Sequence, residues 1–448
     1  MQSLQKFTNF LSIGLLISVL SGCATAQKGG EGFVSLFNGK DLTGWRGGDT
    51  YDHRKLLALP EEKRAEQIAK WTSSMLATNA KTGQSHWYGE NGELVNDGFG
   101  AYATTEKDYG DFELLVDYKT VPLADSGIYL RGVPQVQIWD YTEKAKFSIG
   151  GDKGSGGLWN NSPGAPGKDP LVLADKPFGQ WNSFRIFMVG SRVSVWLNGK
   201  LVVDHANMEN YYDRKTAIPA KGPIQLQTHG GEIRWRNIRL REIGSEEANR
   251  ILSGKGQQGF NSIFNGRDFT GWAGSVDNYV VTNGAVLCKA GKGGTIFTKD
   301  EYSDFVARVE FKVPSGGNNG LALRYPGTGD TAYAGLCELQ VLDDNYDKVK
   351  GKIDPRQVHG SAYGMVGAQR GYQHPIGEWN FEEVTVSGSK IKVELNGTVI
   401  LDADLSKVTE YMANSAHPGK DRTSGHFGFA GHNDPVAFRN VQIKKLAE

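Results

Sequence analysis

The chain has 448 residues, 39% hydrophobic and 22% charged, and its 50 basic and 50 acidic side chains leave a formal net charge of zero. This balance speaks against nucleic acid or an anionic surface as a partner, and the length is sufficient for two sizeable cores. The 59 glycines, nearly twice the usual share of about 7%, favour a β-rich protein with many tight turns.

The first 27 residues predict an export signal. A weakly basic start is followed by an apolar run over residues 10–20, which is too short to span a membrane as a helix, and then by "LSGC". This ending resembles the lipobox of bacterial lipoproteins, in which the cysteine, here Cys23, becomes the lipidated N-terminus. The alternative is an ordinary cleaved signal peptide with an incidental cysteine. We therefore expect residues 1–23 to be removed or modified and the protein to face the periplasm or cell surface, with the lipid as its only membrane contact.

A long repeat organises the remainder. "GFVSLFNGKDLTGW" (residues 32–45) returns as "GFNSIFNGRDFTGW" (residues 259–272), with ten of fourteen residues identical, and "WRNIRLREI" (235–243) returns as "FRNVQIKKL" (438–446). A period this long encloses a whole domain rather than a solenoid unit. The repeat predicts two related domains, residues 31–243 and 259–448, joined by a polar linker over residues 244–258.

Short alternating runs predict most of each domain as strands. Examples are "FELLVDYKTV", "SGIYLRG", "QVQIWD" and "RVSVWLNGKLVVD", the last with an Asn198-Gly199 hairpin turn. Short, evenly spaced strands are typical of an all-β sandwich or jelly roll. The exception is residues 60–77, where a leading proline, two glutamates and apolar residues at helical spacing predict an amphipathic helix. This insertion is either packing material or a lid at the rim.

Strand alternation places polar and aromatic side chains opposite the core on three strands of the first domain. These residues are Tyr129, Arg131, Gln135, Gln137, Trp139, Gln225, Gln227 and His229. Amides, a guanidinium, an imidazole and flat rings are the groups that a sugar-binding surface needs. A solvated outer face is the alternative, but such faces are usually rich in Lys, Glu and Thr.

At these residues the chain resembles a known family. "LFNGKDLTGW", "SGIYLRGVPQVQIWDY", "DKGSGGLWNN" and "GPIQLQTHGGEIRWRNIRLREI" are similar to the 3-keto-disaccharide hydrolase family, which was long only a domain of unknown function. The resemblance implies two tandem concanavalin-like or laminin-G-like jelly rolls. It also implies cleavage of a glycoside whose sugar is oxidised at C3, because the ketone acidifies the C2 proton and lets the group at C1 leave by elimination, with hydration as an optional further step. The alternative function is a lipid-anchored protein that binds carbohydrate without cleaving it.

That chemistry needs a base near C2, a donor for the enolate oxygen and an acid for the leaving group. We expect His229 to be the base or acid and Arg131 to be the donor, although a structural histidine and an ion pair of Arg131 with Asp125 or Asp140 are alternatives. Asp140 either caps a turn, orients His229 or acts as the acid. The remaining expected contacts are hydroxyl binding by Gln135, Gln137 and Gln227, with Tyr129 and Gln225 on the same face, stacking on Trp139 or Trp159, and a rim of Lys153 and Asn160.

The second domain keeps part of this set. Arg324, Gln340, Asp343 and His432 correspond to Arg131, Gln137, Asp140 and His229, whereas Glu338 stands in place of Gln135. We therefore expect both domains to share a fold and a polar core of residues, but not a substrate.

No cofactor is evident from the sequence. Residues 343–354 have the acidic spacing of a calcium loop but lack its glycine and its final glutamate, no His/Cys cluster indicates zinc, and a divalent metal has no assignable ligands. Cys288 and Cys337 lie in apolar alternating runs and are expected to be buried free thiols. Because the chain has no nucleotide-binding fingerprint, the resemblance implies a functional link to a separate sugar 3-dehydrogenase.

Overall fold

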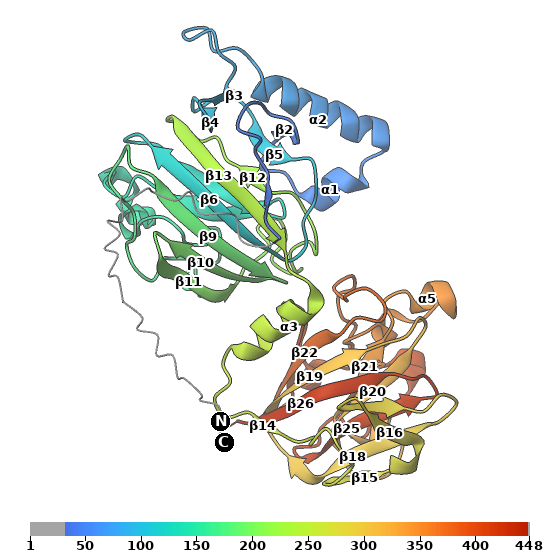
Figure 1. Ribbon diagram of the computed structural model, residues 1–448. Helices are drawn as coiled ribbons and strands as arrows, with labels where there is room; N and C mark the ends of the chain where they lie inside the picture. The colour runs from blue at the N-terminus through green and yellow to red at the C-terminus, as the bar shows by residue number, and fades with distance from the viewer. Residues whose placement is uncertain (1–31, 447–448) are drawn as a thin grey trace, which may run out of the picture.

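The computed structural model describes residues 32–446, so the predicted signal peptide with Cys23 lies outside the described residues. Within this range the chain folds into two halves, each built from one large and one small antiparallel sheet (Figure 1). This arrangement confirms the predicted all-β, sandwich-like fold class. No helix in the described range is long and apolar enough to cross a membrane.

The larger sheet of the first half has the order β11-β10-β9-β6-β13-β4-β3, with β1 beside β13, and the smaller has the order β2-β5-β12-β7-β8. The larger sheet contains β1 (Val34–Ser35), β3 (Trp87–Glu90), β4 (Glu93–Asn96), β6 (Phe112–Thr120), β9 (Asn182–Val189), β10 (Arg192–Leu197), β11 (Lys200–Asn207) and β13 (Ile233–Glu242). The smaller contains β2 (Trp45–Gly48), β5 (Tyr102–Thr105), β7 (Ser126–Leu130), β8 (Val133–Ile138) and β12 (Gln225–Leu226).

The second half repeats this topology, with the orders β16-β17-β26-β19-β22-β23-β24 and β15-β18-β25-β20-β21 and with β14 beside β26. Its larger sheet contains β14 (Asn261–Ser262), β16 (Tyr279–Thr282), β17 (Ala285–Cys288), β19 (Phe305–Lys312), β22 (Asn380–Ser387), β23 (Lys390–Leu395), β24 (Thr398–Asp404) and β26 (Ala437–Lys445). Its smaller sheet contains β15 (Trp272–Gly274), β18 (Gly293–Tyr302), β20 (Asn318–Tyr325), β21 (Cys337–Leu342) and β25 (Gly425–His432). Cys288 and Cys337 are buried free thiols, as expected.

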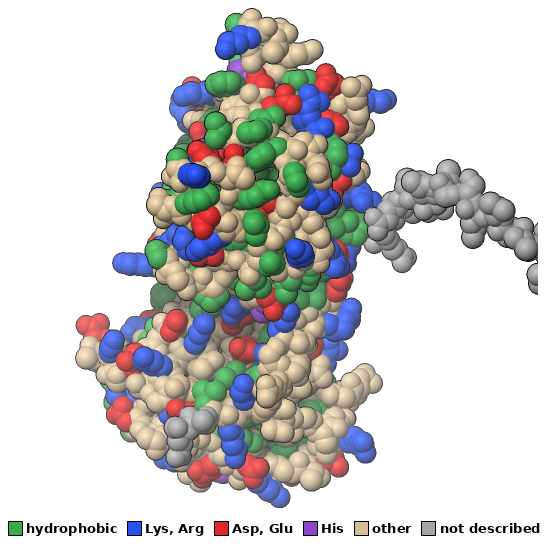
Figure 2. Space-filling view, turned by 90° about the vertical axis from the view of Figure 1, so that its left-hand side faces the viewer, with side chains coloured by type: hydrophobic (Ala, Val, Ile, Leu, Met, Phe, Trp, Pro, Cys, Tyr) green, Lys and Arg blue, Asp and Glu red, His purple; other side chains and the backbone are tan. Residues whose placement is uncertain are grey.

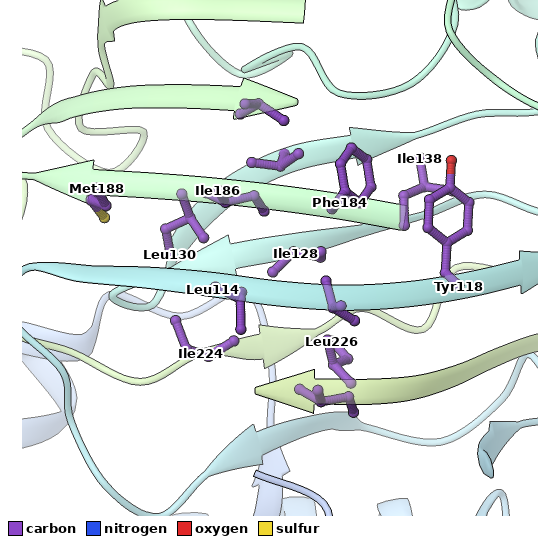
Figure 3. Packing of buried hydrophobic residues seen from close by; sticks show 14 of the residues in the cluster. Leu114, Tyr118, Ile128, Leu130, Ile138, Phe184, Ile186, Met188, Ile224 and Leu226 are labelled. Atoms are coloured by element: carbon purple, nitrogen blue, oxygen red, sulfur yellow. The ribbon is translucent and has the colours of Figure 1, made fainter. Parts of the chain in front are cut away.

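Strand alternation fills the space between the two sheets of the first half with apolar side chains. Figure 3 shows Leu114 and Ile186 of the larger sheet packed with Ile128 and Leu226 of the smaller one. All four are fully buried. Each such side chain contributes about 1.5–3 kcal/mol relative to leaving it exposed. This burial forces the alternate residues of β7, β8 and β12 onto the opposite face of the smaller sheet.

The repeated opening stretch builds the same turn in both halves. In the first half, Asn38 and Asp41 hydrogen-bond to each other at 2.7 Å, and the indole of Trp45 donates to the carbonyl of Leu36 at 2.7 Å. The second half reproduces both contacts with the corresponding residues at 2.8 and 2.9 Å. The hydrogen bonds from Thr43 and Asn38 lower the pKa of Asp41 to about 2. The duplicated sequence therefore specifies a structural turn rather than a site.

The predicted helical insertion is present as α1 (His53–Ala58) and α2 (Glu61–Met75). Helix α2 buries Trp71 and Met75 against β2. A Cβ atom at Gly47 of that strand would lie 2.1 Å from the Trp71 backbone, so the helix and strand approach closely only because residue 47 is glycine.

The segment predicted as a linker contains a packed helix, α3 (Ser245–Gly254), which lies between the two halves in Figure 1. Its Ala248 and Leu252 are buried in a cluster with Val189 of the first half and Phe381 of the second. Arg192 adds an ion pair to Glu394 across the junction, with 2.8 Å between Nε and Oε1. The connection is therefore a structured interface.

Basic and acidic side chains are interspersed on the face seen in Figure 2, where hydrophobic side chains also reach the surface of the first half. That face carries no extended patch of one charge sign, in agreement with the zero net charge of the chain.

Candidate functional site

A cavity of about 330 Å³ opens on the face of the smaller first-half sheet that points away from the core. Eight of the predicted site residues line it together: Tyr129, Gln135, Gln137, Trp139, Trp159, Asn160, Gln227 and His229. Residues that the sequence analysis did not assign to the site also line it: Thr50, Tyr102, Asp125, Pro134, Lys146, Ile149 and Tyr211. A larger cavity of about 520 Å³ lies between the two halves, but no predicted site residue lines it.

Asp125 is the centre of the cavity's hydrogen-bond network. It is only 7% exposed. Its carboxylate accepts from Gln137 Nε2 at 2.8 Å and from Lys146 Nζ at 3.0 Å, and it lies 3.3 Å from His229 Nδ1. From the sequence, Asp125 was expected only as an alternative ion-pair partner of Arg131. Strand parity could have found it, because Asp125 precedes β7 in phase with Tyr129, which also faces the cavity.

The carboxylate fixes the direction of a chain of amides. Because ionised Asp125 only accepts hydrogen bonds, Gln137 must present its NH₂ group to it, and the Gln137 oxygen then accepts from Gln135 Nε2 at 2.6 Å. The Gln135 oxygen is left buried without a partner, as are the amide oxygens of Gln227 and Asn160. Three unpaired acceptors suit a ligand that is rich in hydroxyl groups.

Gln135 lies directly over a glycine of the neighbouring strand. A Cβ atom at Gly127 would lie 2.3 Å from the Gln135 Oε1 atom. Any larger residue at position 127 would displace this amide, so the glycine holds the acceptor in place.

His229 follows β12 and remains 58% exposed. Its hydrogen bond to Asp125 raises the pKa of the imidazole, against the opposing effects of partial burial and of the Lys146 charge. Since Nδ1 faces Asp125, Nε2 is the ring nitrogen available to a ligand.

Lys146 supplies the cation of this cavity from a short 3₁₀ turn, Lys144–Ile149. Its ammonium lies 5.6 Å from the centre of the Trp139 ring, and Trp139 meets Trp159 edge to face at 5.7 Å. Burial lowers the pKa of Lys146, but hydrogen bonds to Glu143 and Asp125 outweigh it and leave the pKa raised. Lys146 is therefore a permanent cation beside the Trp139 and Trp159 rings.

Arg131 lies outside this cavity, which corrects the expectation that it donates to the substrate. Its backbone φ of 53° breaks the strand alternation, and the side chain turns to the other side and is 1% exposed. There the guanidinium binds Asp111 at 2.6 Å and the carbonyl of Gly110 at 2.8 Å, so neither Asp125 nor Asp140 is its partner. Arg324 repeats this with Asp304 at 2.7 Å, and the arginine is a structural element of both halves.

Three further predicted residues lie outside the cavity. Asp140 caps a turn, accepting from the backbone N–H groups of Leu123 and Thr142, each at 2.8 Å, and it makes no contact with His229. Lys153 pairs with Asp169 at the surface. Gln225 is buried and donates to the Thr104 hydroxyl at 3.0 Å.

The second half has a corresponding cavity of about 250 Å³. The predicted residues Glu338, Gln340 and His432 line it, together with Asn318, Asp330, Ala332, Tyr333, Leu342, Tyr346, Ile353, Gln357 and Tyr363. Glu338 is 2% exposed, lies 3.2 Å from His432 Nε2 and, through this hydrogen bond, raises the pKa of His432. Arg324 lies elsewhere, and Asp343 accepts backbone N–H groups of Gly316 and Asn345.

Residues 343–354, the segment with calcium-loop spacing, include the short helix α5 (Tyr346–Val349). No group of three or more His, Cys, Asp or Glu side chains in residues 32–446 is arranged to hold a metal ion.

The two cavities deliver the carboxylate to the histidine from different strands. Gly127 pairs with Gln137 in the first half and Gly320 pairs with Gln340 in the second, which fixes the correspondence between them. In this register Asp125 corresponds to Asn318, and Gln135 corresponds to Glu338. The carboxylate and the amide have therefore exchanged places, while the histidine–carboxylate pair is kept.

Fold and cavities together define a tandem β-sandwich protein with pockets lined by amide, aromatic and ionisable side chains on the outer faces of its small sheets. The family described as "3-keto-alpha-glucoside-1,2-lyase-like domain" matches residues 32–241 and 259–444, and the chain belongs to this family. A curated relative, a 3-keto-disaccharide hydrolase from Bacteroides thetaiotaomicron, is 26% identical over 228 residues, which are 42% of this chain and 79% of that protein.

Solved structures are also similar to part of the chain. A "putative glycosyl hydrolase" from Parabacteroides distasonis is 26% identical and covers 43% of this chain and 95% of its own, with a TM-score of 0.37. A carbohydrate-binding module, CBM66 from Bacillus subtilis, is 13% identical and covers 39% of this chain and 96% of its own, with a TM-score of 0.28.

Proposed function

We propose that the protein cleaves glycosides whose sugar carries a ketone at C3, and that the first-half cavity performs the reaction. The observation that carries the proposal is the His229–Asp125 pair beside Lys146 in an amide-lined cavity. The chain's family and the name of its Bacteroides relative support the choice of a 3-keto sugar.

The proposed reaction begins with removal of the C2 proton. Neutral His229 accepts this proton at Nε2, and the electron pair forms an enolate with O3, while Asp125 stabilises the resulting imidazolium. The Lys146 ammonium balances the charge that develops on the enolate oxygen. The enolate then collapses to the C3 ketone with a C1–C2 double bond, and the C1–O bond to the aglycone breaks. The leaving oxygen takes its proton from the His229 imidazolium, which returns to the neutral form. Water can subsequently add to this enone and give the 3-keto sugar.

The other lining groups bind the ring. The unpaired oxygens of Gln135, Gln227 and Asn160 would accept hydrogen bonds from hydroxyl groups, and Trp139 and Trp159 would stack against the sugar. No nucleophilic carboxylate is required, in contrast to retaining glycosidases, which use two carboxyl groups about 5–5.5 Å apart.

Turnover of oxidised and parent sugars tests the proposal. The soluble chain beginning after Cys23 would be incubated with 3-keto-trehalose and with trehalose, and products would be followed by mass. We expect 3-keto-glucose or its enone from the oxidised sugar alone. His229→Ala and Lys146→Met should reduce the rate at least about a hundredfold, whereas Lys144→Met, an exposed lysine on the same turn, should not.

Absence of product from the oxidised sugar would refute this reaction. If intact glycans then bound saturably, the protein would be a carbohydrate-binding protein instead.

We further propose that the protein is exported and anchored by lipid at Cys23. A sugar 3-dehydrogenase would have to supply its substrate, since the proposed reaction consumes a ketone and does not make one. Labelling of cells with a fatty acid analogue should mark the wild-type chain and not Cys23→Ser; equal labelling would refute the anchor.

A further inference from the structure

The two cavities differ in charge. Charged side chains lining the first are Asp125 and Lys146, beside His229. Those lining the second are Glu338 and Asp330, beside His432, and no lysine or arginine is among the described residues that line it. With neutral histidines the first cavity is balanced and the second carries two negative charges; with protonated histidines the first carries one positive charge and the second one negative charge.

The second cavity also presents an unused acceptor. Gln340 is 3% exposed, and its Nε2 donates to Asn318 Oδ1 at 2.8 Å. Its Oε1 is buried and has no hydrogen-bond partner. Because a buried acceptor without a hydrogen-bond partner is unfavourable, a ligand that donates to this oxygen gains affinity.

Aromatic rings complete the lining. Tyr333, Tyr346 and Tyr363 all border the cavity, and the rings of Tyr333 and Tyr363 meet edge to face at 6.5 Å. The faces of tyrosine rings attract cations. Asp330 is exposed and uses Oδ1 to accept the Ala332 N–H at 3.0 Å, which leaves Oδ2 for a ligand.

We propose that the second cavity binds sugars that carry a protonated amine, whereas the first binds neutral sugars. An ammonium group has three donors and no acceptor, which matches two carboxylates and an unpaired amide oxygen. A neutral sugar would leave the net negative charge of this cavity uncompensated, and an anionic sugar would be repelled. The inference rests on the proposed function, because it assigns a substrate class to the second-half counterpart of the proposed sugar site.

Isothermal titration calorimetry of the soluble chain beginning after Cys23 tests the inference. The probes are the β-1,4-linked dimer of glucosamine, its N-acetylated form and cellobiose. The pH is about 6, well below the pKa of about 7.7–8.0 of an α-amino group, which serves as the reference for the sugar amine. We expect the glucosamine dimer to bind at least about tenfold more tightly than the two uncharged probes.

Two variants locate the binding. Asp330→Asn keeps a residue that caps the short helix α4 (Thr331–Ala334) and should weaken binding about threefold to fivefold, the range of an exposed ion pair. Glu338→Gln removes the buried carboxylate and should weaken it about tenfold or more. Asp125→Asn, the matched change in the first cavity, should leave the affinity unchanged.

Equal affinity for the three probes, an unaffected Asp330→Asn variant, or a loss caused by Asp125→Asn would each overturn the inference. So would binding of Ca²⁺ or Mn²⁺ that Asp330→Asn abolishes without any preference for the amine, since the site would then be a metal site. Continued cleavage of 3-keto-trehalose in any of these cases would leave the proposed reaction intact, and amine binding without cleavage would refute the reaction alone.

Discussion

The exchange of carboxylate and amide between the two cavities predicts that the carboxylate partner of His229 can be supplied from position 135 instead of position 125. In the first cavity, Asp125→Asn removes the charge facing His229, and Gln135→Glu restores one at the position from which Glu338 meets His432. The single Asp125→Asn variant should lose most activity toward 3-keto-trehalose. The double variant should regain a large part of it with Nδ1 as the base, because Glu338 meets its histidine through Nε2.

The size of the loss follows from the geometry. A carboxylate 3.3 Å from an imidazolium contributes about 5 kcal/mol at an effective dielectric constant of about 20. Because His229 is 58% exposed, solvent screening reduces this by roughly half. About 2.5 kcal/mol of stabilisation of the protonated base corresponds to a rate loss of roughly fiftyfold to a hundredfold. The double variant should release product at least about tenfold faster than Asp125→Asn.

The assay is single-turnover release of product by the wild type, the two single variants and the double variant. Thermal unfolding of each variant serves as the control, since Asp125 also binds Gln137 and Lys146 and its loss could loosen the loop. A double variant no faster than Asp125→Asn, with an unchanged fold, would refute the idea that either strand can supply the carboxylate. Unimpaired activity of Asp125→Asn would refute the catalytic pair itself.

Three other predictions can be checked separately. The positive charge of Lys146 lowers the pKa of His229, so Lys146→Met should raise that pKa. Because the residual activity requires neutral His229, the acid limb of the variant's pH–rate profile should move to higher pH. Gly127→Ala would place Cβ 2.3 Å from Gln135 Oε1 and should raise KM about tenfold with little change in kcat. Arg131→Met strips the donor from buried hydrogen-bond partners and should lower the free energy of unfolding, measured in urea, by about 3–5 kcal/mol.

Alternation along the strands was enough to predict the fold class and much of the first cavity. Ile128 and Leu226 are in the core, and the side chains of Tyr129, Gln137 and Gln227 face the cavity, because a pleated strand allows no other assignment once its apolar face is buried. The same rule does not apply where the backbone leaves the extended region. Arg131 has positive φ, and its side chain therefore lies away from the face that strict alternation predicts.

Strand alternation could not predict where the side chains of residues outside the strands lie. Lys146 reaches the cavity from a 3₁₀ turn, where nothing in the local sequence indicates which side chain points inward. The helix α3 was missed because its polar composition resembles a linker, although Glu246 and Glu247 in its first turn and Ala248 four residues before Leu252 fit a helix with one buried stripe. Tertiary contacts with both halves, rather than propensity, define this helix.

The repeats therefore separate what builds the fold from what selects a ligand. The duplicated opening turn and the paired Arg131–Asp111 and Arg324–Asp304 contacts are the same in both halves. The two arginine side chains are buried, so protein groups must supply their hydrogen-bond partners. At the cavities, by contrast, only the histidine, its carboxylate and one glutamine recur, and the carboxylate itself comes from a different strand. If every lining residue were fixed, the carboxylate and the amide could not exchange positions between the two cavities. In each cavity a carboxylate lies within hydrogen-bond distance of the imidazole, whereas the rest of the lining differs between the two halves.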